Sequence, residues 1–197
     1  MLNLPIQTEI NKQLPKTAIF QKLMLNTAQK ESFDKDISRI YIANEISERT
    51  VNITKGEKID SVFVLHIHLK TIDFNEKNIT MLSKMIDRNI VYLLEYENQF
   101  RLGIYHTKLI AGNWTISPTI PLDGFNLDMV WENIVKAIGG IDIEQGNNLE
   151  QQIVINEQEE KILKQIELLE KKMRNTKQFN EQVKIKNELK KLRKELN

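Results

Sequence analysis

Cysteine is absent from this chain of 197 residues. Its absence excludes disulfides, thiolate zinc sites and cysteine nucleophiles, and it is typical of proteins that work in a reducing compartment. Long apolar runs are missing as well, and residues 1–13 lack the basic region and apolar stretch of a signal peptide. We therefore expect neither a membrane span nor secretion. Together these absences predict a cytoplasmic protein.

Glycine and proline are scarce, with seven and four residues. The glycines are not clustered as a phosphate-binding loop requires, and no serine lies in the sequence that exposes a nucleophile on a sharp turn. The sequence therefore indicates no cofactor, and it favours a non-catalytic protein over an enzyme.

Charge is distributed unevenly along the chain, although the net charge is only +1. Residues 1–150 carry 16 basic and 19 acidic side chains, whereas residues 151–197 carry 12 and 8. Within residues 171–197 there are ten basic side chains and three acidic ones. This asymmetry indicates that the C-terminal segment is a separate electrostatic unit.

Residues 1–145 are predicted to form one α/β (α+β) domain, because helix and strand patterns alternate along them. Apolar spacing and capping residues predict helices over Lys16–Leu25, over Ala28–Asp36 with Thr27 as its cap, over Asn75–Asp87, and over Met129–Ile138 with Asn126 or Asp128 as its cap. Strands are predicted over Ser38–Ser47, Thr50–Ile53, Ile59–Lys70, Asn89–Glu95, Phe100–Leu109 and Trp114–Ile116.

The strand Ile59–Lys70 has apolar residues on both faces, which predicts a central strand covered on both sides. The order of the elements favours a mixed, mostly antiparallel sheet flanked by helices. Gly139 and Gly140 are predicted to end the last helix of this domain, because the pair supplies a left-handed C-cap.

Residues 146–197 show a different pattern, with apolar side chains at alternating spacings of four and three. This spacing is the seam of a coiled coil, and it is interrupted between Asn175 and Asn180. An antiparallel helical hairpin is the predicted structure, and one long bent helix is the alternative. The seam residues are Ile162, Ile166, Leu169, Met173, Ile185, Leu189, Leu192 and Leu196.

The chain has three histidines, and two of them, His66 and His68, lie two residues apart in a predicted strand. Residues at this spacing in a strand point the same way, so both imidazoles are candidates for one metal ion. His106 is the candidate third ligand, and Asp60 shares the face of His66. The competing interpretation is two structural histidines on a partly covered sheet face.

A second candidate is a nuclease site made of Asp60, His66, His68 and Lys70. Many restriction-type nucleases place an acid, one residue and a lysine on a core strand, where the acid binds a metal and the lysine orients water. Here His68 occupies the position of the acid, which argues against an active nuclease. The competing interpretation is that Lys70 ends a strand and extends into water.

A third candidate is a basic surface near the C-terminus, with few aromatic residues among its lysines and arginines. Such a surface can neutralise phosphates of nucleic acid or bind an acidic partner, and the competing interpretation is a solvated coiled-coil face. Its members are Lys171, Lys172, Arg174, Lys177, Lys184, Lys186, Lys190, Lys191, Arg193 and Lys194.

The chain resembles a bacterial family of unknown function over nearly its whole length. The most distinctive parts are the stretch from Asn126 to Ile153, which includes Trp131-Glu132-Asn133-Ile134 and Gly139-Gly140, and the lysine-rich stretch from Leu169 to Leu196. Members of this family look like small partners encoded beside DNA methyltransferases and helicases in restriction or antiphage defence loci. The resemblance identifies no catalytic residues in this chain, so it implies a genomic neighbourhood rather than a mechanism.

Three hypotheses follow for the function. The first is a non-catalytic accessory or adaptor subunit of a bacterial restriction or antiphage defence system, which docks on a helicase or methyltransferase through its α/β domain and basic hairpin. The hairpin supplies either the contact with this partner or a basic arm near DNA. The second is a divergent metal-dependent nuclease. The third is a coiled-coil homodimer whose α/β domain binds a small ligand.

Overall fold

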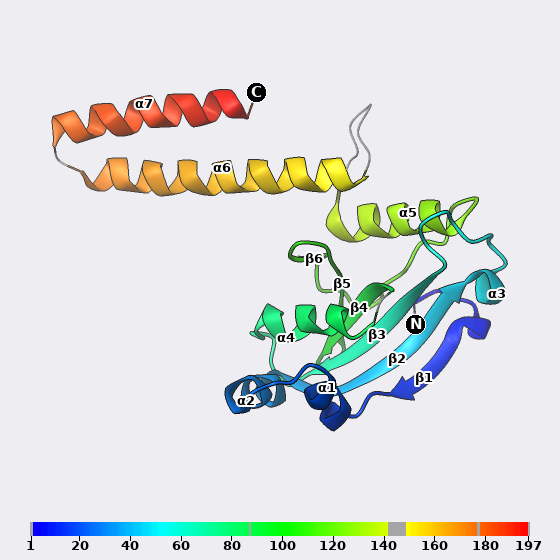
Figure 1. The fold of residues 1–197 in the computed structure, drawn as a ribbon. Coiled ribbons are helices and arrows are strands. Elements are labelled where there is room, and N and C mark those ends of the chain that lie inside the picture. Colours follow the sequence, from blue (N-terminus) through cyan, green and yellow to red (C-terminus); the bar gives the residue numbers. More distant parts are fainter. Residues whose placement is uncertain (1, 87, 142–148, 177, 197) are drawn as a thin grey trace. The chain divides into compact units, whose positions relative to one another are not determined.

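The computed structural model describes residues 2–86, 88–141, 149–176 and 178–196. In these residues the helices are α1 (Lys16–Lys22), α2 (Thr27–Asp36), α3 (Glu48–Val51), α4 (Glu76–Thr80), α5 (Leu127–Gly139), α6 (Leu149–Asn175) and α7 (Phe179–Glu195), with 3-10 turns η1 (Ile6–Thr8) and η2 (Met81–Lys84) (Figure 1). The strands are β1 (Glu9–Gln13), β2 (Ile37–Ser47), β3 (Ser61–Leu69), β4 (Asn89–Tyr96), β5 (Gln99–Tyr105) and β6 (Leu109–Ala111).

The strands in the described residues form one six-stranded sheet, in which the spatial order β1 to β6 follows the chain. Four neighbouring pairs are antiparallel, and β3 and β4 are parallel. Parallel neighbours need a crossover, and α4 with η2 supplies it between these two strands. The predicted mixed, mostly antiparallel sheet with flanking helices is confirmed.

The main apolar cluster joins α1, α2 and α4 to one face of the sheet. Its fully buried members include Ile19, Phe33, Leu65, Ile67 and Ile79. Val62 and Val64, which point to the other face of β3, are also fully buried. The central strand is therefore covered on both faces over its first half, and burying this much apolar surface is the main force that holds the unit together.

Two short elements differ from the prediction. The predicted strand Thr50–Ile53 is wrong, because the chain turns there into α3. The backbone N–H of Ser47 donates to the Thr50 hydroxyl at 2.9 Å, a local bond that favours the start of a helix over an extended strand. The cap of α2 is Asn26 rather than Thr27, since the Asn26 side chain accepts from the backbone of Gln29.

The region after β4 contains two strands where the sequence predicts one. A tight hairpin at Glu97 and Asn98, both with positive φ, joins β4 to β5, as two-residue turns require. The predicted strand Phe100–Leu109 divides into β5 and β6 around a turn at residues 106–108. The predicted edge strand Trp114–Ile116 is reduced to one bridge between Phe100 and Thr115.

Helix α5 starts and stops where the capping residues predict. The Asn126 side chain accepts from the backbone of Met129, and Gly140 adopts the left-handed C-cap with φ of 59°. Asp128 has a different role: its carboxylate accepts backbone N–H groups of Glu57 and Ile59 at 2.8 and 2.9 Å. A glycine at position 56 makes this approach feasible, because a β-carbon there would lie 2.0 Å from the Asp128 carboxylate.

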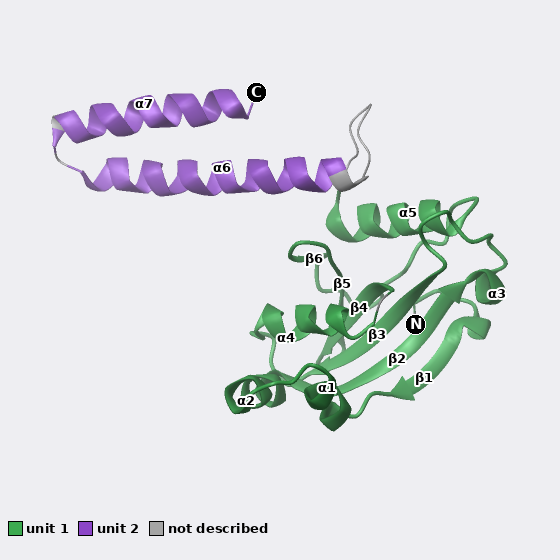
Figure 2. Cartoon of the chain, in the orientation of Figure 1, with its two compact units in different colours: residues 1–141 green, residues 142–197 purple. Residues whose placement is uncertain are grey.

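The chain divides into two compact units, residues 1–141 and residues 142–197 (Figure 2). The predicted boundary between residues 145 and 146 lies outside the described residues. In the second unit, α6 and α7 run antiparallel, and Lys172 pairs with Glu181 beside the connection at 3.2 Å. The eight seam residues named above form one apolar cluster, centred on buried Ile166, Ile185 and Leu189. The hairpin thus closes within one chain.

No helix in the described part of the chain combines the length and the continuous apolar character that crossing a bilayer requires.

Replacing Leu189 with alanine is expected to open the hairpin without unfolding the first unit. Leu189 is 4% exposed, and truncating a buried leucine costs roughly 2–5 kcal/mol. Hydrogen exchange of the full chain should show faster exchange in residues 149–196 and unchanged exchange in β2 to β4. Leu168→Ala is the matched control, because Leu168 is 68% exposed. Equal exchange in the two variants would contradict the assigned seam.

Candidate functional site

A polar cluster of two histidines and one glutamate lies on the sheet where β3 and β4 run side by side. His66 and His68 are two residues apart on β3, so their side chains point to the same face. The parallel register sets His68 opposite Glu95 on β4. One ligand-type atom from each of the three side chains lies within 4.8 Å of the others, in the part of the chain that the structure describes.

The glutamate bridges both imidazoles. His66 Nε2 lies 2.5 Å from Glu95 Oε2, and His68 Nδ1 lies 3.1 Å from the same oxygen. The centroids of the two imidazole rings are 4.2 Å apart. Because a carboxylate can only accept, His66 donates through Nε2 to Glu95. The three side chains are 19%, 33% and 23% exposed, so the cluster is partly buried.

Aromatic rings from β2 and β5, the neighbours of β3 and β4 in the sheet, flank the cluster. The Tyr41 ring on β2 meets His68 edge-on, with 5.6 Å between centroids, and Phe100 on β5 lies 6.4 Å from His66. Burial first, and then the charge of His68, lower the pKa of His66, while the hydrogen bond and charge of Glu95 oppose this shift. The net effect is that the folded chain disfavours the protonated form of His66 relative to a free histidine.

His106 is not part of this cluster, so the predicted set of His66, His68 and His106 is not assembled. The register of β4 and β5 sets Phe100, rather than His106, opposite Glu95. His106 lies in the exposed turn beyond the other end of β5. Glu95 is instead the third ligand-type side chain of the cluster. The sequence alone gives no sign of this, because the parallel pairing that sets Glu95 beside His68 depends on the fold.

The predicted nuclease residues do not converge. Asp60 directly precedes β3 and Lys70 directly follows it. At about 3.3 Å per residue, the two lie roughly 30 Å apart along the strand. Asp60 lines a different hollow, a cavity of about 450 Å³ whose wall also contains Ser61, Tyr92 and Trp131. Lys70 therefore lies too far away to orient water at a metal ion bound by Asp60.

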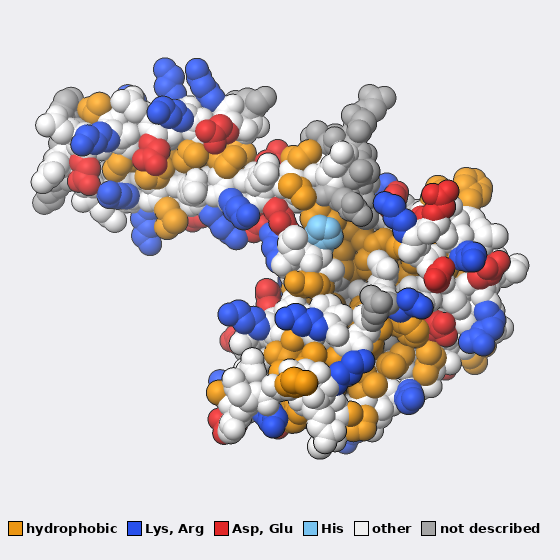
Figure 3. Space-filling view, viewed as in Figure 1, with side chains coloured by type: hydrophobic (Ala, Val, Ile, Leu, Met, Phe, Trp, Pro, Cys, Tyr) orange, Lys and Arg blue, Asp and Glu red, His pale blue; other side chains and the backbone are white. Residues whose placement is uncertain are grey.

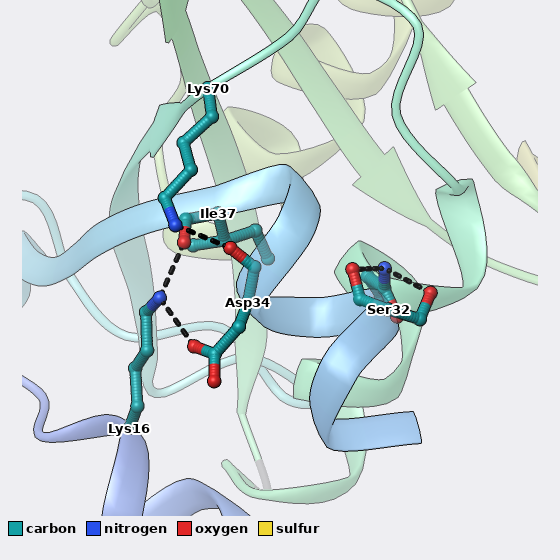
Figure 4. Close-up of polar contacts among 6 residues, drawn as sticks. Lys16, Ser32, Asp34, Ile37 and Lys70 are labelled. Carbon is teal, nitrogen blue, oxygen red and sulfur yellow. Dashed lines mark hydrogen bonds and ion pairs between the residues drawn. The ribbon is translucent and has the colours of Figure 1, made fainter. Parts of the chain in front are cut away.

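Lys70 instead holds the junction between α2 and β2 (Figure 4). Its Nζ donates to the backbone carbonyl of Asp34 at 2.5 Å. Lys16 Nζ reaches the same turn and donates to the Asp34 carboxylate at 2.7 Å and to the Ile37 carbonyl at 2.5 Å. Cations are favourable at the last carbonyls of a helix, so both lysines stabilise the C-terminal end of α2.

The basic side chains of the C-terminal segment lie on the surface of the hairpin (Figure 3). All of the predicted set are exposed apart from Lys177, which lies outside the described residues. A groove of about 1320 Å³ runs along the hairpin, and apolar Met173 and Val183 form part of its wall. Five cations and one acid, Glu170, line it, and the cations are Arg174, Lys186, Lys190, Arg193 and Lys194. Glu170 pairs with Arg193 at 2.7 Å.

The fold and these surfaces define a mixed-sheet α/β protein that carries a basic helical hairpin. Comparison with protein families matches residues 2–196 to the family described as a domain of unknown function (DUF4391). The chain belongs to this family. No curated protein and no solved structure gave a significant match.

The lowered pKa of His66 makes the stability of the folded chain depend on pH. In the unfolded chain His66 has a pKa near 6.5, and in the folded chain its pKa is lower. The unfolded chain therefore binds more protons below about pH 6.5, so the free energy of unfolding falls as the pH decreases there. His66→Gln is expected to reduce this fall between pH 7 and pH 5. Urea unfolding in buffer with EDTA measures it.

His106→Gln is the control for this experiment, because it removes an exposed histidine. It should leave the pH dependence unchanged. A fall in stability that is the same in the wild type and in His66→Gln would contradict the assigned burial of His66.

Proposed function

We propose that this protein is a non-catalytic accessory subunit of a bacterial DNA restriction or antiphage defence system. In this proposal the α/β unit and the hairpin dock on a helicase or DNA methyltransferase, and the basic groove of the hairpin faces DNA. The resemblance of residues 126–153 and 169–196 to small partners of such enzymes supports the choice of system.

The groove of the hairpin is the observation that carries the proposal. Five cations against one acid favour an anionic occupant, and the array of phosphates on DNA offers regularly spaced negative charges. Helix α7, with 17 residues, extends about 25 Å, enough to follow several phosphates. The cations project from a folded hairpin, so they lose little conformational entropy on binding compared with a disordered tail.

The two other hypotheses have less support. The nuclease requires a metal-binding acid and a water-orienting lysine at one site, whereas Asp60 and Lys70 lie at opposite ends of β3. The homodimer requires a free seam, whereas Ile166, Ile185 and Leu189 are already buried between α6 and α7 of one chain. A dimer through this seam would have to open the hairpin first.

Affinity purification of the tagged chain from its native host tests the docking partner. We expect mass spectrometry to identify a DNA helicase or DNA methyltransferase in stoichiometric amount. Leu189→Ala, which is expected to open the hairpin, should reduce recovery of this partner, and Leu168→Ala should not. Recovery of the chain alone, or with proteins that do not act on DNA, would contradict the proposal.

Neutralising the groove tests the interaction with DNA. The variant Lys186→Gln, Lys190→Gln, Lys194→Gln should bind duplex DNA at least about tenfold more weakly at low salt. The slope of log K against log salt should also become shallower by about 0.9 for each phosphate that the variant no longer neutralises. Fluorescence anisotropy with duplexes of unrelated sequence measures both.

The matched control removes three exposed lysines from the α/β unit, Lys12→Gln, Lys35→Gln and Lys84→Gln. It has the same net charge as the groove variant and should keep wild-type affinity. Equal weakening in both variants would indicate that only net charge matters, and that result would reject the groove as the DNA-binding surface.

A further inference from the structure

We infer that His66, His68 and Glu95 form a binding site for a divalent transition-metal ion of the zinc class, with one coordination position left open. The site lies in the α/β unit alone and does not depend on the proposed function. Its basis is three side chains of ligand type that the parallel pairing of β3 and β4 brings to one point of the sheet.

The spacing of the ligand atoms is near what such an ion requires: two of the three distances lie within about 1 Å of it, and all three are below 4.8 Å. In a tetrahedral site with bonds of about 2.0–2.1 Å, the ligand atoms lie about 3.3 Å from one another. The distance between His68 Nδ1 and Glu95 Oε2 is 3.1 Å, already near this value. His66 Nε2 is 2.5 Å from the same oxygen, so it must move away by less than about 1 Å, which a rotation of the glutamate side chain supplies.

The donor set selects the kind of ion. Two imidazole nitrogens and one carboxylate oxygen suit zinc and its first-row neighbours, whereas magnesium and calcium prefer ligands that are all oxygen. Three protein ligands leave one tetrahedral position for water or for a ligand atom of another molecule. Because Glu95 balances only one of the two positive charges, a hydroxide or an anionic group is favoured in that position.

The scaffold holds the three ligands in place. Ile67 separates the two histidines on β3 and Leu94 precedes the glutamate on β4, and both are fully buried on the opposite face of the sheet. The ligands therefore come from two central strands rather than from loops, which limits their movement in the absence of an ion. Tyr41 and Phe100 flank the cluster and restrict the approach of solvent.

A purely structural alternative predicts a different result. In that case the cluster serves only to hold β3 and β4 together through the hydrogen bond between His66 and Glu95. Added metal ions should then bind to the cluster no more tightly than to the exposed His106. Titration of the full chain, freed of metal by EDTA and dialysis, distinguishes the two. Co²⁺ is the probe, because tetrahedral cobalt gives intense visible absorption bands, and Zn²⁺ then displaces it.

We expect one equivalent of Co²⁺ to bind with tetrahedral bands, and one equivalent of Zn²⁺ to abolish them. Glu95→Gln and His68→Asn should each weaken binding by about a hundredfold or more, since each removes a ligand of the ion itself and removal of a supporting residue alone costs roughly 10–100-fold. Bound Zn²⁺ should also raise the Tm of the wild type but not of these variants.

His106→Asn is the control and should bind as the wild type does. Far-UV circular dichroism identifies any variant that fails to fold, and the near-isosteric Glu95→Gln then provides the comparison. The inference is overturned if the wild type shows no saturable bands, if the bands survive both ligand variants, or if His106→Asn weakens binding as much as they do.

Discussion

The parallel pairing of β3 with β4 is the constraint on which the rest of the first unit depends. Every other neighbouring pair in the described sheet is antiparallel, but parallel neighbours need a crossover. This requirement places α4 and η2 over the sheet, where Ile79 and Leu82 complete the main core. The same register sets Glu95 beside His68, so core formation and assembly of the polar cluster have one cause.

The helical hairpin is stabilised in a different way from the sheet. Its apolar cluster is small, and both α6 and α7 are rich in charged residues. Pairing of the two helices buries the apolar seam between them and leaves the charged faces in water. Because the connection between the helices is short, the seam closes locally at low entropic cost. A basic surface is thereby held in a fixed shape on a unit whose own core does not depend on the sheet.

The sequence predicts most elements because periodicity and capping are local signals. The central strand from Ser61 to Leu69 and helix α5 are found close to their predicted limits, since apolar alternation, Asn126 and Gly140 each act within a few residues. Strand β1 has no such signal, because all five of its residues are exposed and carry no burial pattern. The candidate metal ligand Glu95 escapes prediction for another reason: its neighbours are set by strand pairing, which single-sequence patterns do not encode.

Asp128 has a consequence for where this fold can be divided. The carboxylate at the start of α5 holds the backbone of residues 57–59, about 70 positions earlier in the chain, directly before the central strand. A fragment that stopped after β6 would leave these three N–H groups without their acceptor and would lack the apolar face of α5 as well. We therefore expect the first unit to complete its native fold during translation only after α5 has been synthesised and has left the ribosome.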